Sequence, residues 1–108
     1  MLNQQAPHQH DDIHTRYLNI VASDSMNNDR RVTIHEGTLH DGRKFYFKYR
    51  FGVAILIEYV NRRYEQTRQE VAERVSHDSD NALTIEEYRR VFLKLHQRIA
   101  DSETPTPE

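Results

Sequence analysis

Over residues 44–51 an aromatic set alternates with a mostly basic set, and this alternation constrains the fold of the chain more than any other feature. Phe45, Phe47, Tyr49 and Phe51 fall on one face, and Lys44, Tyr46, Lys48 and Arg50 fall on the other. A period of two with a single aromatic face is typical of a half-buried β-strand. The sequence therefore predicts a strand from about Lys44 to Phe51 that packs its aromatic face against a core.

A second strand precedes this one and completes a β-hairpin. Val32 and Ile34, with threonines at 33 and 38, favour a strand over about 31–39, with a bulge at Gly37. The Asp41-Gly42 pair that follows favours a type I′ turn, in which both central residues need φ > 0. Residues 23–29 have a loop composition, and 13–22 have an ambiguous period that favours a strand around Tyr17–Ala22 over a helix.

Beyond Phe51 the apolar spacing changes to three and four residues. A stripe of this kind predicts one long amphipathic helix over about 53–76, and its members are Val53, Ile57, Val60, Tyr64, Thr67, Val71 and Val75. A last helix begins with a capping box, in which Thr84 is the N-cap and Glu87 is the N3 residue. We thus expect an α+β fold: a small antiparallel β-hairpin or sheet packed against a two-helix antiparallel hairpin. The single domain spans 12–101, with flexible tails at 1–11 and 102–108.

The composition of the chain excludes several classes of function. It contains no cysteine, so disulfides, thiolate zinc sites and cysteine nucleophiles are impossible. The longest apolar run, 51–57, is far shorter than the roughly 20 residues that span a bilayer, and the N-terminus has no signal-peptide pattern. With three glycines and no glycine-rich or nucleophile motif, the sequence predicts a protein without enzymatic activity and without a cofactor. The lack of cysteine and of a signal-peptide pattern predicts a cytoplasmic location.

The segment between the two expected helices resembles the calcium loop of the EF-hand family. The resemblance covers 76–88 and implies ligands at the third, fifth and twelfth loop positions, occupied here by Asp78, Asp80 and Glu87. Ser76 stands where the family has its first aspartate, which implies weak binding. The same residues have another interpretation, because a capping box explains Thr84 and Glu87 without a metal.

The expected hairpin carries a cluster of basic residues around one tyrosine. Cations that neutralise phosphates, interleaved with a ring that stacks on a base, are what single-stranded nucleic acid requires, but a protein partner or a solvated sheet face would suit the same residues. Residues 30–68 hold nine Lys or Arg against four Asp or Glu, although the whole chain has a net charge of −2. The candidate binding residues are Arg30, Arg31, Arg43, Lys44, Tyr46, Lys48 and Arg50.

The expected long helix exceeds what a small core needs. Its continuing stripe at Tyr64, Val71 and Val75 would be covered either by the last helix or by a second copy of the chain in a homodimer. The leading hypothesis is a non-enzymatic interaction or regulatory module, of the kind found among bacterial or phage accessory proteins. It would bind a protein partner through the hairpin and the long helix. A calcium module and a nucleic-acid-binding protein are the alternatives.

Overall fold

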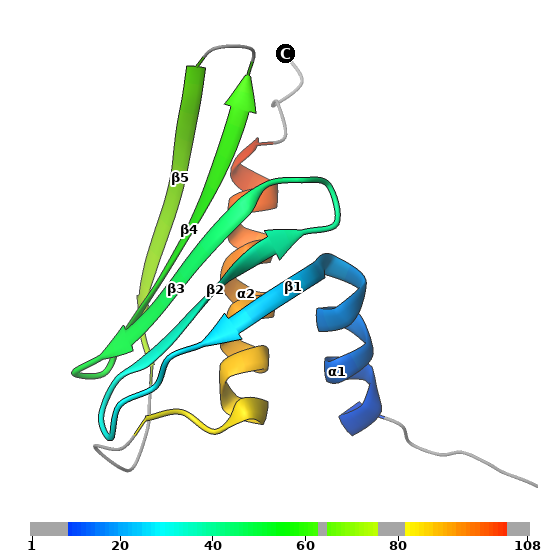
Figure 1. The fold of residues 1–108 in the computed structure, drawn as a ribbon. Coiled ribbons are helices and arrows are strands. Elements are labelled where there is room, and N and C mark those ends of the chain that lie inside the picture. Colours follow the sequence, from blue (N-terminus) through cyan, green and yellow to red (C-terminus); the bar gives the residue numbers. More distant parts are fainter. Residues whose placement is uncertain (1–8, 63–64, 76–81, 104–108) are drawn as a thin grey trace, which may run out of the picture.

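The structure is a computed structural model that describes residues 9–62, 65–75 and 82–103. Within these described residues, two helices and five strands follow one another (Figure 1). Their bounds are α1 Gln9–Ile20, β1 Val21–Met26, β2 Thr33–Leu39, β3 Lys44–Arg50, β4 Val53–Arg62, β5 Glu65–Arg74 and α2 Ile85–Glu103.

The five strands form one antiparallel sheet in the order β1-β2-β3-β4-β5, so each strand pairs with its neighbour in sequence. Residues of both helices join the buried cluster on one face of this sheet. The expected α+β class is confirmed, and so are the strands over about 31–39 and 44–51.

The long helix expected over 53–76 is wrong. This segment forms β4 and β5, which pair from Val53↔Arg74 to Arg62↔Glu65. The residues Val53, Ile55, Ile57 and Tyr59 are β-branched or aromatic and alternate with a second set that also contains apolar residues. A run that is apolar on both faces does not distinguish a strand from a buried helix by its period, and β-branched content then favours the strand.

The turns of the sheet also differ from the expectation. In the β2–β3 turn, the Gly42 amide donates to the Leu39 carbonyl at 2.9 Å, and Gly42 alone has a positive φ, of 94°. This is a three-residue loop closed by a left-handed glycine, not the expected type I′ turn. The two-residue loop with φ > 0 at both positions joins β3 to β4 instead, at Phe51 (φ 54°) and Gly52 (φ 76°).

The strand expected around Tyr17–Ala22 is wrong over most of its length, because residues 9–20 form a helix. α1 continues through Tyr17 to Ile20, and β1 then occupies Val21–Met26, most of the segment expected to be a loop. The register shift lies in β1, between Val21 and Ser23, and not at Gly37. A Cβ atom at Gly37 would lie 1.9 Å from the Ser23 carbonyl oxygen, so this close approach of two strands requires glycine.

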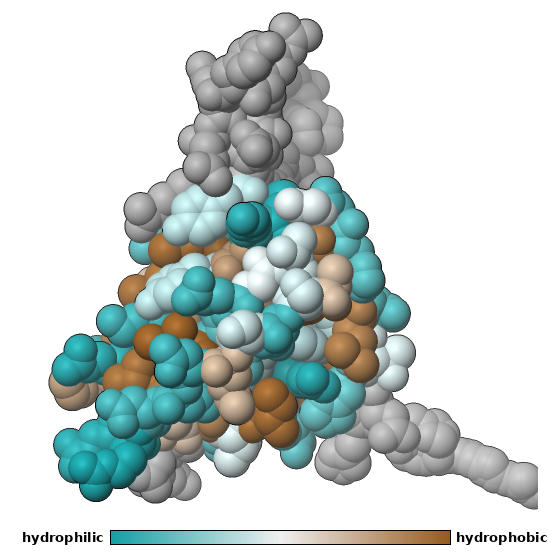
Figure 2. Space-filling view, in the orientation of Figure 1, coloured by the Kyte–Doolittle hydropathy of each residue, from teal (hydrophilic) through white to brown (hydrophobic). Residues whose placement is uncertain are grey.

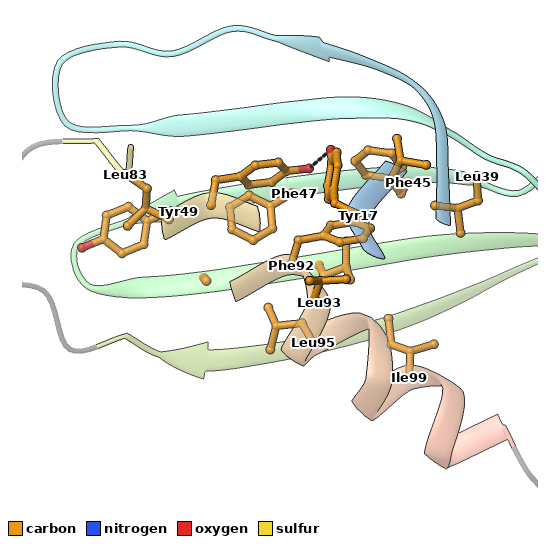
Figure 3. Close-up of a cluster of buried hydrophobic side chains, with 14 residues drawn as sticks. Tyr17, Leu39, Phe45, Phe47, Tyr49, Leu83, Phe92, Leu93, Leu95 and Ile99 are labelled. Atoms are coloured by element: carbon orange, nitrogen blue, oxygen red, sulfur yellow. Dashed lines mark hydrogen bonds between the residues drawn. The ribbon is translucent and has the colours of Figure 1, made fainter. Parts of the chain in front are cut away.

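The core lies between the sheet and the helices (Figure 3). The aromatic face of β3 meets the apolar stripe of α2, and the ring centroids of Phe45 and Phe92 are 5.2 Å apart. The expected capping box is confirmed: the Thr84 amide donates to Glu87 Oε1 at 2.8 Å, and the Glu87 amide donates to Thr84 Oγ1 at 3.1 Å. Local capping and the apolar stripe thus fix where α2 begins and which face it buries.

Candidate functional site

The basic residues expected to form one cluster are divided by the structure among three places. Lys44, Tyr46 and Lys48 alternate with the buried aromatics of β3 and therefore lie on the opposite face of the sheet. Arg30, Arg31 and Arg50 line a different part of the molecule, at the end where β3 turns into β4. Arg43 turns inward toward the helices.

We call the sheet face opposite the helices the open face, because no helix among the described residues packs on it. The strand register places residues from β2, β3 and β4 side by side there: Ile34 beside Lys48 and Ile55, and Glu36 beside Tyr46 and Ile57. Ile57 is only 8% exposed although no helix covers it. Figure 2 shows apolar patches between hydrophilic side chains on the side of the molecule that it views.

One part of the open face is hollowed. A hollow of about 600 Å³ is lined by Ser25, Glu36, Gly37, Thr38, Lys44, Phe45, Tyr46 and Tyr59. Lys44 pairs with Tyr59 across β3 and β4, so a cation and two tyrosines share this surface. Their combination suits either an acidic, partly apolar protein surface or a stacked base.

The tip of the β3–β4 hairpin holds a second basic aromatic group, formed by Arg30, Arg31, Arg50 and Phe51. These residues line a hollow of about 400 Å³ together with Asp29 and Val32. Phe51 is 77% exposed, and the guanidinium carbon of Arg50 lies 4.6 Å from its ring centroid. An exposed aromatic residue with a positive φ carries a conformational cost. This tip is therefore a second candidate contact surface.

Arg43 belongs to a largely buried ionic cluster, and its Nε also donates to Asp41 Oδ2 at 2.9 Å; a binding role for Arg43 stays a prediction. Its Nη1 atom lies 3.1 Å from Glu58 Oε1, and His96 Nδ1 lies 2.5 Å from Glu58 Oε2. Glu58 is fully buried, and its Oε1 accepts no hydrogen bond from the described residues, so the contact with Arg43 is electrostatic. Sequence reasoning did not predict the contact of Glu58 with His96. It had placed Glu58 on a helix, and no local pattern links two residues so far apart in sequence.

A second buried polar network was also missed by sequence reasoning. The Tyr17 hydroxyl donates to Asp24, so Tyr88 must donate to the Tyr17 hydroxyl, 2.6 Å away. Asp24 Oδ1 also lies 3.0 Å from His35 Nδ1, and the His35 ring stacks on Tyr88 at 3.5 Å. The network joins α1, β1, β2 and α2.

Burial and hydrogen bonding shift the pKa values in this network. Burial raises the pKa of both Tyr17 and Tyr88, and the bond to Asp24 raises that of Tyr17 further. Burial alone would also raise the pKa of Asp24, but the hydrogen bonds from His35 and Tyr17 outweigh it and lower that pKa. Each of these polar groups is satisfied by another member, so the network serves as a polar core between the elements.

The residues expected to bind calcium are only partly described. Asp78 and Asp80 lie outside the described residues, and Glu87 accepts the capping bond from Thr84. The chain enters this segment from strand β5, where a helix was expected. Calcium binding at Asp78, Asp80 and Glu87 stays a prediction.

The stripe expected to form a dimer interface is covered in part by the chain itself. Val71 and Val75 pack against the buried cluster, while Tyr64 lies outside the described residues. Self-association stays a prediction, and these two valines are already in contact with their own core.

Comparison of the chain with protein-family models, with curated proteins and with solved structures found no match. Neither described helix is both long enough and apolar enough to cross a bilayer.

Proposed function

We propose that this protein is a non-enzymatic interaction module that binds a protein partner through the open face of its sheet. The observation that carries the proposal is the apolar centre of a face that no described helix covers: half-buried Ile34 and Ile55 beside buried Ile57, adjoined by half-buried Tyr46 and Tyr59. An antiparallel sheet with one solvated face normally presents polar residues there. Aliphatic and aromatic side chains on such a face are typical of a contact surface.

The charge around this centre indicates what the partner presents. Lys44 and Lys48 lie on the open face, and Arg50 continues the same strand toward the basic tip. Their positive charges outnumber the acidic side chains of Glu36 and Glu70 on this face. We therefore expect a partner with an apolar patch bordered by Asp and Glu, because complementary rims steer association and exclude wrong partners.

Charge reversal on the open face tests the proposal. Affinity capture from the organism that makes the protein identifies candidate partners, and each candidate is then purified and titrated with the wild-type chain and its variants. Lys44→Glu with Lys48→Glu should weaken binding by about tenfold or more, chiefly through a slower association rate.

A matched control reverses two charges elsewhere. Arg16→Glu with Arg90→Glu changes the net charge equally on exposed helix positions, where the ion pairs with Asp12 and Glu86 contribute little. This control should bind as the wild type does. A purified partner that binds the Lys44/Lys48 variant as tightly as the control would refute the proposal.

Single-stranded nucleic acid is a second candidate, favoured by the hollow that brings Lys44, Tyr46 and Tyr59 together. Two rings beside a cation match the stacking and phosphate contacts of such ligands. Binding of oligonucleotides at two salt concentrations separates the candidates. A phosphate-based interaction must weaken as salt rises and must fail in Lys44→Glu with Lys48→Glu.

A further inference from the structure

The two edges of the sheet differ in how they are protected. Strand β5, at one edge, has the sequence EQTRQEVAER with five charged residues. Strand β1, at the other edge, has the sequence VASDSM, whose single charge, Asp24, bonds inward to Tyr17 and His35. Natural proteins block exposed strand edges with lysine, proline, bulges or inward charge. β1 has a bulge between Val21 and Ser23 and the inward charge of Asp24, but no lysine or proline.

The backbone of β1 offers hydrogen-bonding groups along this edge. The Asn27 amide donates to the Ile34 carbonyl at 2.8 Å, so Asn27 points toward β2. Because inward and outward groups alternate along an antiparallel strand, Ser25 also points inward, whereas Asp24 and Met26 direct their N–H and C=O groups outward. Residues 22–26 are all exposed, as expected for a strand that pairs on one side only.

Three large exposed apolar side chains gather beside the same edge. Leu18 from α1, Met26 from β1 and Ile85 from α2 are 55%, 59% and 48% exposed. All three line one hollow of about 320 Å³, which Tyr17, Asp24 and His35 also line. A partly apolar hollow beside outward backbone groups that no other described strand pairs with is the arrangement used to add a strand to a sheet.

We propose that β1 pairs antiparallel with β1 of a second copy of this chain, about a two-fold axis at Ser25. A two-fold interface must be self-complementary, and the register centred on Ser25 meets that condition with its outward backbone groups facing one another. Asp24 opposite Met26 of the second copy, and Met26 opposite Asp24 of the second copy, gives four backbone hydrogen bonds. The alternative register about Asp24 would set two carboxylates directly opposite each other, which is unfavourable.

The chosen register also accounts for the exposed apolar residues. Met26 and Asp24 lie on the helix side of the sheet, because they pair with His35 and Gly37. Met26 of the second copy is therefore placed over the hollow that Leu18 and Ile85 line, and Met26 of the first copy covers the same hollow in the second copy. The result is one continuous ten-stranded sheet with both open faces on the same side. Ser25 also lines the open-face hollow, but the inference uses no other open-face residue and stands or fails separately from the proposed function.

A cysteine scan tests the register, because the chain has no thiol of its own. Ser25→Cys places two thiols in a non-hydrogen-bonded pair about 4.5 Å apart at Cα, within the range that a disulfide spans. With oxidised glutathione, we expect it to form a covalent dimer at least about tenfold faster than Ser23→Cys, an equally exposed control on the same strand and face. Equal rates for the two variants would overturn the proposed register.

Sedimentation at several concentrations tests the dimer itself. The wild-type chain should dimerise, and Met26→Pro, which removes an outward N–H without touching the bonds to β2, should remain monomeric. Met26→Asp serves the same purpose if the proline variant does not fold. Phe51→Asn, which removes an exposed apolar residue at the hairpin tip, should dimerise normally. A wild-type chain that is monomeric at every concentration, or a Met26→Asp variant that still dimerises, would overturn the proposal.

Discussion

The hydroxyl of Tyr88 on α2 donates a hydrogen bond to the hydroxyl of Tyr17 on α1, 2.6 Å away, inside the core (Figure 3). Tyr17 in turn donates to Asp24 on β1. The N-terminal helix is thus joined to the C-terminal helix and to the edge strand by a short polar relay in addition to apolar packing. Four predictions about folding follow from this relay, from the other buried ionic cluster and from the hairpin tip.

Removing the central hydroxyl of the relay should destabilise the fold. Tyr17→Phe leaves the Tyr88 hydroxyl buried without its acceptor and removes one donor from Asp24. We expect the free energy of unfolding to fall by about 1–3 kcal/mol, the range for a buried polar group that loses its partner. Denaturant titration measures this, with Tyr46→Phe on the open face as the control. A loss no larger than that of Tyr46→Phe would contradict the relay.

Asp24 should make the fold sensitive to acid. Its folded-state pKa lies below the ordinary value of about 3.9, so its ionised form stabilises the folded state above that pH. This contribution is lost as the pH falls through the folded-state pKa, that is, below about pH 4.

Unfolding free energies of wild type and Asp24→Asn between neutral pH and pH 2 test this linkage. The wild-type curve should fall more steeply on the acid side, and the difference between the two proteins should shrink as the pH falls. Asp101→Asn, an exposed substitution near the end of α2, controls for the loss of one carboxyl. Parallel curves for wild type and Asp24→Asn would contradict the prediction.

Substitution of Glu58 should be among the most destabilising changes in the chain. Its side chain is fully buried between Arg43, whose side chain is 18% exposed, and His96. Glu58→Ala removes the buried anion that Arg43 and His96 share, while Asp41 stays 2.9 Å from Arg43 Nε, so we expect a loss of about 1–3 kcal/mol in unfolding free energy. Thermal and denaturant unfolding measure it against Glu36→Ala on the open face. A loss below 1 kcal/mol would mean that the cluster contributes little.

Replacing Phe51 should stabilise the folded protein. A non-glycine residue with φ near 54° is strained, and asparagine tolerates this conformation better than phenylalanine does. Phe51→Asn should raise the unfolding free energy by about 0.5 kcal/mol, because relief of strain is partly offset by the lost contact with Arg50. Gly52→Ala, also at positive φ, should lower it by about 1 kcal/mol. A clear loss of stability in Phe51→Asn would show that the ring packs more tightly than its 77% exposure indicates.

Sequence reasoning identified the elements whose signals are local. The alternation of Lys44–Arg50 and the Thr84–Glu87 capping box each need only a few neighbouring residues, and both were found. It failed over 53–76, where apolar residues on both faces fit a helix and a strand equally. There the outcome depended on pairing with β3, which is a long-range interaction.

The sequence predicted which residues are candidates for binding, but not where all of them lie in the structure. Lys44, Tyr46 and Lys48 do share one face, because the period of a strand fixes that. Arg43, next to them in sequence, turns inward because Glu58 is buried on β4, and no local pattern reveals such a partner. The network of Tyr17, Asp24 and His35 was missed for the same reason, since its members come from three elements.

Site-specific photo-crosslinking tests the central claim, the open face as a partner surface, most directly. A benzophenone amino acid is placed at Tyr46 on the open face, or at Gln97 on the exposed side of α2, and the protein is irradiated in the organism that makes it. We expect a discrete crosslinked protein from position 46, lost when excess wild-type chain competes and retained when the Lys44→Glu, Lys48→Glu chain competes. Position 97 should give no such product. Equal products from both positions, or a product that both competitors remove equally, would contradict it.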